Sequence, residues 1–204
     1  MKVGFIFECG RDGADGQVCR YFANRLTPGI VIVPQFMDNK PNLLENYGPI
    51  ASVLVKSCER VIILWDLYPA WREKHIKPCR KEDRDKIFAS LQSSKVPLHK
   101  IALVCIEEEL EAWLLTDKRA LKAVLSNYKR PRPVGNLPNF GVPEWIQRPK
   151  TRLTKIFNQE LGAYRRYEEL RDAIKIARAM PDFNRIKRSY TFRRFVEKAT
   201  GVVL

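Results

Sequence analysis

The sequence has few of the residues that build zinc sites and disulfide frameworks. Its only histidines are His75 and His99, and its five cysteines are widely spaced, odd in number and without a CxxC pair. No two of these residues have the spacing that zinc ligands usually show. Cys19, Cys58 and Cys105 lie in apolar runs and are expected to be small buried side chains. The cysteine pattern therefore argues against zinc and favours a reducing cytosol.

Long apolar runs are also absent. The first run, residues 3–7, ends at Glu8 and is too short for a signal peptide or a membrane span. The chain has no P-loop, internal repeat or low-complexity tract. We therefore expect a cytoplasmic protein that has no membrane contact, and any ATPase that works with it would be another chain.

Acidic residues are outnumbered, because 37 Lys and Arg stand against 23 Asp and Glu, for a net charge of +14. Residues 1–125 carry 19 basic and 16 acidic side chains, whereas residues 126–204 carry 18 and 7. Most of the positive charge therefore belongs to the last third of the chain. Such an excess predicts a polyanionic partner, namely nucleic acid. The alternative is a basic face that only keeps the protein soluble.

Apolar runs alternate with helical patterns along the first two-thirds of the chain. The expected strands are residues 3–7, 29–36, 60–66 and 100–106. The expected helices are residues 17–26, 41–57 with a break or kink near Gly48 and Pro49, 80–94, and one continuous helix over 107–125. Continuous apolar strands that alternate with helices predict an α/β fold, with a mostly parallel Rossmann-like sheet of about four strands covered on both faces.

A change in composition divides the chain. Residues 128–149 contain five prolines and two glycines, which predicts a linker or loop. It separates an α/β domain at residues 1–127 from a basic helical region at residues 150–204 that packs on it. Helices are expected in that last region at residues 150–161, 164–179 and 191–199.

Carboxylates follow three of the four predicted strands. In open parallel sheets, binding sites form at the carboxyl ends of the strands, where the loops come together. Clustered carboxylates repel one another unless a cation neutralises them, and hard oxygen ligands suit Mg²⁺ or Mn²⁺. The acids in question are Glu8, Asp12 and Asp15 after the first strand, Asp66 at the end of the third, and Glu107, Glu108, Glu109 and Glu111 after the fourth.

Several of these acids also have a purely structural interpretation. Asp12 and Asp15 could be turn residues. Glu107 to Glu109 could complement the positive end of a helix dipole. Asp117 falls on the apolar stripe of the predicted helix and is expected to be a buried capping or hydrogen-bonding acid. Glu8 and Asp66 directly follow apolar strands, where an unpartnered carboxylate is costly, so we expect a functional role for both.

The same segments carry a resemblance to a known family. A Glu ends the first strand before a glycine-rich acidic loop, an Asp ends the third, and ELEAWLLTD follows the fourth at residues 109–117. Together they resemble TOPRIM-like proteins, and more narrowly an uncharacterised family related to OLD-type nucleases in which E-x-E-A-W-L-L-x-D recurs. YTFRRF at residues 190–195 resembles that family's closing helix. The resemblance implies a TOPRIM-like fold and a metal-dependent nuclease, often in prokaryotic defence against phage or plasmids.

The resemblance also implies roles for individual residues. Glu8 would be a general acid or base or a metal ligand, Asp15 would be the acid of the loop, and Asp66 would be the first Asp of the family's DxD. Leu67-Tyr68 follows Asp66, so the second Asp of that motif is absent. Glu109 or Glu111 could supply the missing ligand.

We therefore predict a nuclease that uses Mg²⁺ or Mn²⁺ to cleave DNA or RNA, with Glu8 and Asp66 as its catalytic residues. The alternative is a non-catalytic nucleic-acid-binding or regulatory module whose TOPRIM site has degenerated. A third hypothesis is a nucleotide-binding or effector protein of a multi-component defence complex that is inactive until a partner, such as an ATPase, triggers it. The sequence also leaves open a homodimer.

Basic residues in the last third are the predicted contacts to the phosphate backbone. Tyr190 and Phe192 lie among them and are expected to be core residues rather than platforms for base stacking. The predicted nucleic-acid-binding residues are Arg165, Arg166, Lys187, Arg188, Arg193 and Arg194.

Overall fold

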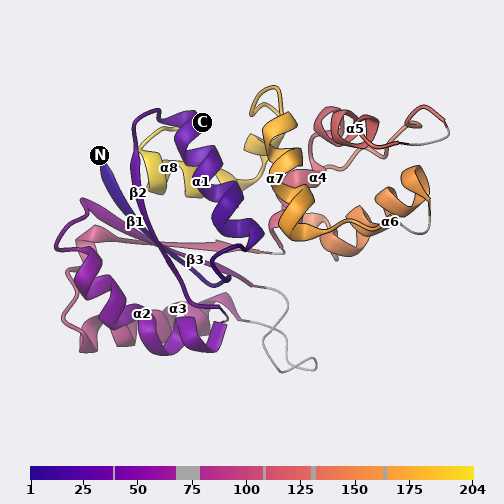
Figure 1. Ribbon diagram of the computed structural model, residues 1–204. Coiled ribbons are helices and arrows are strands. Elements are labelled where there is room, and N and C mark those ends of the chain that lie inside the picture. The colour runs from indigo at the N-terminus through magenta and orange to yellow at the C-terminus, as the bar shows by residue number, and fades with distance from the viewer. Residues whose placement is uncertain (39, 68–78, 108, 130–131, 163–164) are drawn as a thin grey trace.

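The computed structural model describes residues 1–38, 40–67, 79–107, 109–129, 132–162 and 165–204. Its centre is a four-stranded sheet in which every pairing is parallel (Figure 1). The strands lie in the order β2-β1-β3-β4. The predicted Rossmann-like α/β fold is thus confirmed. The strands are β1 (Lys2–Phe7), β2 (Val31–Phe36), β3 (Arg60–Asp66) and β4 (Ile101–Ile106).

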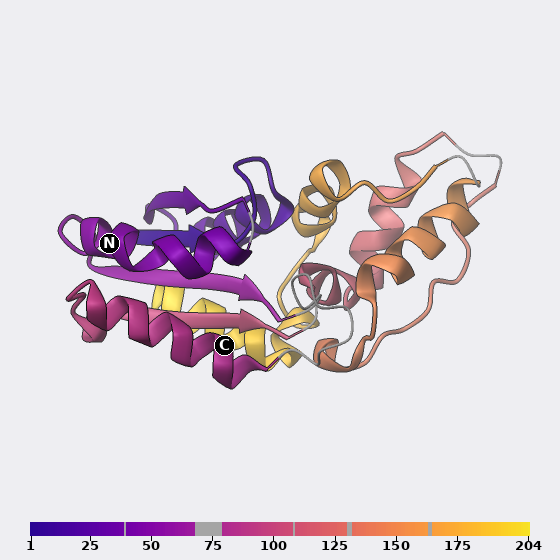
Figure 2. The same ribbon diagram turned by 90° about the horizontal axis from the view of Figure 1, so that it is seen from below.

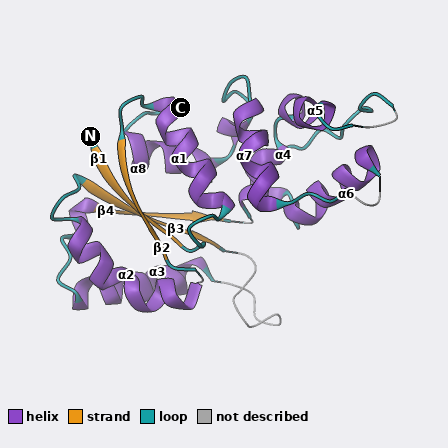
Figure 3. Ribbon diagram, in the orientation of Figure 1, coloured by secondary structure: helices purple, strands orange, loops and turns teal. Residues whose placement is uncertain are grey.

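Helices cover both faces of the sheet (Figures 1 and 3). The face below the sheet in Figure 1 carries α2 (Lys40–Leu54) and α3 (Arg80–Ser93). The opposite face carries α1 (Ala14–Leu26) and α8 (Tyr190–Thr200). A further group of helices extends beyond the carboxyl ends of the strands, as Figure 2 shows from below. These are α4 (Leu110–Leu115), α5 (Lys118–Ser126), α6 (Pro149–Leu161) and α7 (Glu169–Ala179).

The central strands are buried on both faces, as expected of a parallel sheet. Alternate residues face opposite layers, so Phe5 and Ile62 belong to the core beneath α1 and α8. Ile6 and Ile63 are the next residues along the two strands and pair with each other, and they belong to the core beneath α2 and α3. Burial on both faces explains why these segments read as continuous apolar runs.

An aromatic cluster joins α8 to the sheet and to α4. Phe195 meets Phe5 of β1 with ring centroids 6.1 Å apart, and Phe192 meets Trp113 of α4 at 5.3 Å. Phe22 of α1 meets Phe192 at 5.4 Å. Of the two aromatic residues of YTFRRF that were expected in the core, Phe192 is fully buried, as predicted. The prediction for Tyr190 is wrong: Tyr190 is the first residue of α8, it is 37% exposed, and its hydroxyl accepts a hydrogen bond from Arg80. The end of the chain is therefore part of the core of the α/β sheet.

The prediction of one continuous helix over residues 107–125 is wrong. The structure has two helices there, and α5 begins anew after Asp117. Asp117 is 1% exposed and its Oδ1 accepts a hydrogen bond from the Arg119 backbone N–H at 3.0 Å. This confirms Asp117 as a buried capping acid. A capping side chain competes with helix continuation because it satisfies the N–H groups of a new first turn.

Two other helix predictions need correction. Of the break or kink expected near Gly48 and Pro49, the break is not present, since α2 continues through Pro49. The helix expected over residues 164–179 begins only at Glu169, and residues 165–168 are not helical. Residues 163 and 164 lie outside the described residues.

Three of the cysteines, Cys19, Cys58 and Cys105, are buried, as predicted. Within the described ranges, no helix combines the length and the apolar character needed to cross a membrane.

Gly48 lets α2 and α3 approach each other closely. A Cβ atom at this position would lie 2.5 Å from the Oγ atoms of Ser90 and Ser94, and 2.7 Å from the Ser90 carbonyl oxygen. A backbone atom at that distance cannot rotate away, so the two helices would have to separate.

We therefore expect Gly48→Ala to lower the free energy of unfolding. Overpacking of about 1–3 kcal/mol outweighs a helix-propensity gain of about 1 kcal/mol. Urea unfolding followed by circular dichroism measures the change. Gly141→Ala is the control, because a Cβ there meets no atom within 4 Å, and it should change stability by less than about 0.5 kcal/mol. Equal stability of the two variants would contradict this account of the helix contact.

Candidate functional site

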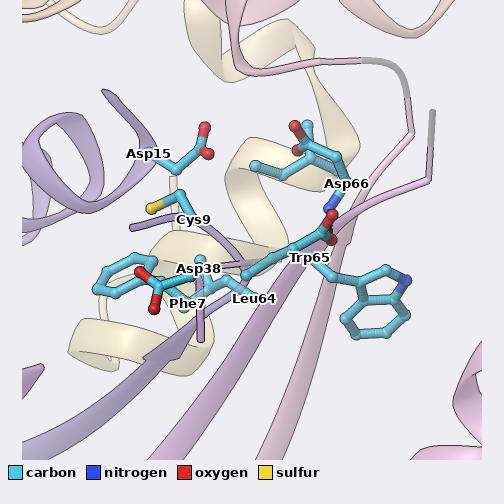
Figure 4. Close-up of a pocket in the computed structure, with 9 residues that line it drawn as sticks. Phe7, Cys9, Asp15, Asp38, Leu64, Trp65 and Asp66 are labelled. Carbon is cyan, nitrogen blue, oxygen red and sulfur yellow. Dashed lines mark hydrogen bonds between the residues drawn. The ribbon is translucent and has the colours of Figure 1, made fainter. Parts of the chain in front are cut away.

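The candidate site lies where the strand order reverses. From β1 the chain proceeds to β2 on one side, whereas β3 and β4 lie on the other. Ligand sites of open parallel sheets form at this switch point, outside the carboxyl ends of the strands. A cavity of about 150 Å³ is found there (Figure 4). It is lined by Phe7, Glu8, Cys9, Asp15, Asp38, Leu64, Trp65, Asp66 and Ile106.

Three of the predicted carboxylates line this cavity. Glu8 follows β1, Asp66 ends β3, and Asp15 lies in the first turn of α1. The Asp66 backbone N–H donates to Glu8 Oε2 at 3.3 Å. Figure 4 shows Cys9 and Asp15 on one side of the cavity, with Trp65 and Asp66 on the other. The parallel register of β1 and β3 thus brings residues 58 positions apart to the same edge.

The other two predicted ligands lie next to the cavity rather than in its lining. Glu109 directly precedes α4, and Glu111 lies in its first turn. Glu111 is only 3% exposed, and its Oε1 accepts a hydrogen bond from the Tyr167 hydroxyl at 3.0 Å. Glu109 Oε2 accepts from the Lys150 backbone N–H at 3.1 Å. The charges of both glutamates act on Asp66.

Burial and mutual repulsion disfavour the charged forms of these acids. Burial, followed by the charge of Glu169, raises the pKa of Asp15 to about 7. Burial raises the pKa of Asp66 well above its ordinary value, and the charges of Asp15 and Glu8 add to the effect. Burial, then Glu169 and Asp15, raises the pKa of Glu111 to about 8. The cluster therefore carries more negative charge than its protein surroundings stabilise.

Sequence reasoning missed three residues that the helical region brings to this cluster. The Lys150 ammonium forms an ion pair with Glu169. Its positive charge lowers the pKa of both Asp15 and Glu111, whereas the neighbouring carboxylates raise these pKa values. Tyr167 holds Glu111. Lys150 is the second residue of α6, Tyr167 lies two residues before α7, and Glu169 is the first residue of α7. No local pattern distinguishes them, because only the docking of these helices places them here.

Asp38 was also missed, although a signal was present. It stands two residues after β2, and an acid just after a strand was the criterion used for the other three strands. Asp38 has a positive φ of 65°, a conformation that Asp tolerates in turns. Its backbone N–H donates to the Cys9 carbonyl at 3.4 Å, which ties the two loops together.

Some of the acids lie away from the cavity. Asp12 is exposed in a turn, in agreement with its structural interpretation. Glu107 pairs with Arg80 at 3.0 Å. Glu108 and Tyr68 lie outside the described residues. Leu67, the residue after Asp66, donates its backbone N–H to the Ile106 carbonyl at 2.8 Å and so extends the pairing of β3 with β4.

The donor chemistry of the cluster fits a hard divalent cation. Carboxylate oxygens are the ligands that Mg²⁺ and Mn²⁺ prefer, and a cation would relieve the repulsion that raises these pKa values. Within the part of the chain that the structure describes, no three Asp, Glu, His or Cys side chains are placed to hold one metal ion. Binding would therefore require side-chain rotations of Glu8, Asp15 and Asp66 around the cavity.

The predicted nucleic-acid contacts lie in different places. Arg165 and Arg166 belong to the segment between α6 and α7, where the Arg165 guanidinium lies over the Tyr128 ring at 5.7 Å. Lys187 and Arg188 lie in a short 3₁₀ helix before α8, and Arg193 donates to the Lys187 carbonyl at 2.7 Å. The structure describes all six residues, and among them only Arg194 forms a hydrogen bond with the sheet. Its Nε donates to the Leu103 carbonyl at 3.0 Å.

The raised pKa values predict how stability depends on pH. The folded state favours the protonated forms of Asp15 and Glu111, so their stabilising effect is present below about pH 4 and is lost as pH rises through about 7 to 8. Without metal, we expect the free energy of unfolding to fall by several kcal/mol between pH 5 and pH 8, because the folded state holds both protons more tightly than the unfolded chain and each pKa unit corresponds to about 1.36 kcal/mol. Urea unfolding in EDTA measures this change.

Asp15→Asn should reduce the slope, whereas Asp12→Asn, in the exposed turn, should leave it unchanged. Mg²⁺ should stabilise the protein more at pH 8 than at pH 5, because ligands bind metal only after they lose their protons. Stability that rises with pH across this range in EDTA would contradict the assigned repulsion.

Comparison with known proteins gives a family but no function. No curated protein and no solved structure matches the chain. The model of a family described as a domain of unknown function, DUF4276, matches residues 18–198. The matched range does not include Glu8 or Asp15. Because the match covers most of the sequence, the chain belongs to the DUF4276 family.

Proposed function

We propose that this protein is a metal-dependent nuclease that hydrolyses phosphodiester bonds of DNA or RNA at the acidic cavity. One observation carries the proposal: carboxylates from separate segments gather at the switch point of the sheet, with pKa values raised by burial and mutual repulsion. Such a cluster in a chain of net charge +14 suits a site where a cation and a polyanion meet. The resemblance of Glu8, Asp66 and ELEAWLLTD to TOPRIM-like proteins supports the same activity.

The residues of the cavity would divide the work. Glu8, Asp15 and Asp66 would hold Mg²⁺ or Mn²⁺, with Glu109 or Glu111 as the nearest further carboxylate. When bound, the ion supplies charge neutralisation at the phosphate and a more acidic water. Glu8 is oriented by the N–H of Asp66, and its carboxylate accepts a proton from the attacking water.

Lys150 fits the same activity. Its ammonium stands beside Glu169 and within the field of Asp15 and Glu111, where it offsets part of their charge. It thus lowers the repulsion that the cavity would present to an approaching phosphate. The role in prokaryotic defence that the resemblance implies, and the partner ATPase of the third hypothesis, stay predictions.

A second function is favoured by two observations. No three metal-binding side chains among the described residues are placed to hold one ion, and the sequence has Tyr68 where the DxD motif of TOPRIM-like proteins has its second Asp. Both fit a nucleic-acid-binding module that does not cleave. This alternative keeps the basic surface and assigns no chemistry to the acids.

Cleavage assays separate the two functions. Supercoiled plasmid, linear DNA and RNA are incubated with purified protein and Mg²⁺, Mn²⁺ or EDTA. We expect cleavage that requires metal and that falls by about 100-fold or more in Glu8→Gln and Asp66→Asn, since each removes a ligand or a proton acceptor. Asp12→Asn is the matched control and should cleave like the parent, because Asp12 lies in an exposed turn.

Two results would overturn the proposal. Cleavage that survives in both Glu8→Gln and Asp66→Asn would place the activity elsewhere or in a contaminant. Salt-sensitive binding without cleavage, under either metal and with every substrate, would favour the binding module.

A further inference from the structure

A groove runs along the edge strand β4. Two hollows of about 550 and 460 Å³ lie there, and they share Arg84, Leu103 and Arg194 in their linings. Figures 1 and 2 show α3 on one face of the sheet and α8 on the other, with β4 at the edge between them. We call this continuous surface the β4 groove.

Positive charge dominates the β4 groove. The acid among its described lining residues is Glu59. The side chains of Arg80 and Arg84 are about half exposed, and Arg194 is exposed as well. A groove with this balance attracts a polyanion. The basic residues along it include Arg60, Arg80, Lys81, Arg84, Arg194 and Lys198.

The edge strand is protected from another protein strand. Arg194 Nε donates to the Leu103 carbonyl, which lies on the open side of β4. A strand that added to this edge would need that acceptor, and it would have to pass the cationic side chains. Charge and hydrogen bonding therefore favour a phosphate backbone over a polypeptide as the occupant.

The groove leads to the acidic cavity. Trp65 lines both the cavity and the groove, and it directly precedes Asp66. In Figure 4 the Trp65 ring points away from Asp15, toward the outside of the cavity. At the same end, Arg80 pairs with Glu107, the first residue after β4. A strand that follows β4 toward its carboxyl end thus arrives beside Glu8 and Asp66.

The length of the groove suits several phosphates. The six residues of β4 span about 20 Å at about 3.3 Å per residue. One strand of B-DNA places a phosphate about every 3.4 Å along the helix axis, so this length corresponds to about six phosphates. The basic side chains that line the groove are enough to contact most of them.

We propose that the β4 groove binds the sugar–phosphate backbone of a nucleic-acid strand and directs it into the acidic cavity. The proposal rests on the proposed nuclease function for the purpose of the groove, but binding can be measured without it. The proposal also changes the predicted nucleic-acid interface. Six basic residues were predicted from the sequence to bind nucleic acid, the structure describes all of them, and only Arg194 lines the groove.

Binding in EDTA tests the groove independently of cleavage. Fluorescence anisotropy is measured with a labelled DNA duplex, the single DNA strand and the matching RNA, over a series of salt concentrations. The groove variant is Lys81→Glu with Arg84→Glu, two exposed positions on α3. The control is Lys118→Glu with Lys122→Glu, two exposed positions on α5 that change the net charge equally. Circular dichroism and thermal unfolding verify that both variants fold.

We expect the groove variant to bind at least about 10-fold more weakly and to lower the salt slope by about two, one for each lost phosphate contact. The control should stay within about twofold of the parent. The probe with the largest loss identifies the strand that the groove accepts. A second variant, Arg84→Lys alone, keeps the charge and should retain most of the binding of the parent.

Three results would overturn the proposal. Equal losses in the groove variant and the control would show that net charge alone sets the affinity. An unchanged groove variant would place the interface elsewhere. Displacement of nucleic acid by poly-glutamate at the same concentration of charge would show that the groove accepts any polyanion. If binding follows the groove but no substrate is cleaved, the groove stands and the nuclease proposal fails.

Discussion

The contact of α8 with the sheet is the interaction on which the rest of the structure depends. Phe192 and Phe195 pack against Phe5, Phe22 and Trp113, and so connect β1, α1, α4 and α8 in one buried cluster. Full burial of a large aromatic side chain contributes on the order of 2–3 kcal/mol, and edge-to-face pairs add to this. Because β1 and α1 also carry Glu8 and Asp15, the cluster that holds the core also fixes two walls of the cavity.

A polar network strengthens this attachment. The Trp113 indole N–H donates to Thr191 Oγ1 at 3.0 Å, and the Thr191 backbone N–H donates to Glu144 Oε1 at 3.1 Å. Ser189 caps α8 by accepting from the Phe192 N–H at 3.0 Å, and its hydroxyl also donates to Glu144. The segment before α6 is thereby tied to the start of α8. Hydrogen bonds among these buried groups fix the position of both segments, although Glu144 Oε2 has no hydrogen-bond partner among the described residues.

Charge is separated over short distances in this protein. Buried carboxylates gather at the switch point, and Lys150 compensates only part of their repulsion. A few residues away, beyond Trp65, the β4 groove is lined mainly by arginine and lysine. A phosphate backbone would neutralise the positive charge of the groove, and a cation would neutralise the negative charge of the cavity. The two surfaces together are consistent with a ligand that brings both charges, as a nucleic acid with bound divalent metal does.

The fold was predictable where the local pattern and the tertiary structure agree. The central strands β1 and β3 read as continuous apolar runs because a parallel sheet buries both of their faces, and the apolar stripe of Leu110, Trp113 and Leu114 is buried as expected. The helix errors arose where a single side chain decides. Asp117 starts a new helix by capping it, and Pro49 is tolerated inside a helix that packs closely on α3 through Gly48.

The candidate site was predictable only in part, for a geometric reason. Parallel strands end at the same edge, so the sequence by itself determined that the acids after the strands would lie along one edge of the sheet. Only the strand order, in which β1 and β3 are neighbours, brings Glu8 and Asp66 close together. The sequence could not determine that Lys150, Tyr167 and Glu169 join them, because α6 and α7 reach the site by packing rather than by proximity in sequence. Nor could it place Arg84 and Arg194 in one groove, since they lie 110 residues apart on helices that cover opposite faces. The sequence fixes charge and periodicity along the chain, whereas only tertiary packing decides which charges meet.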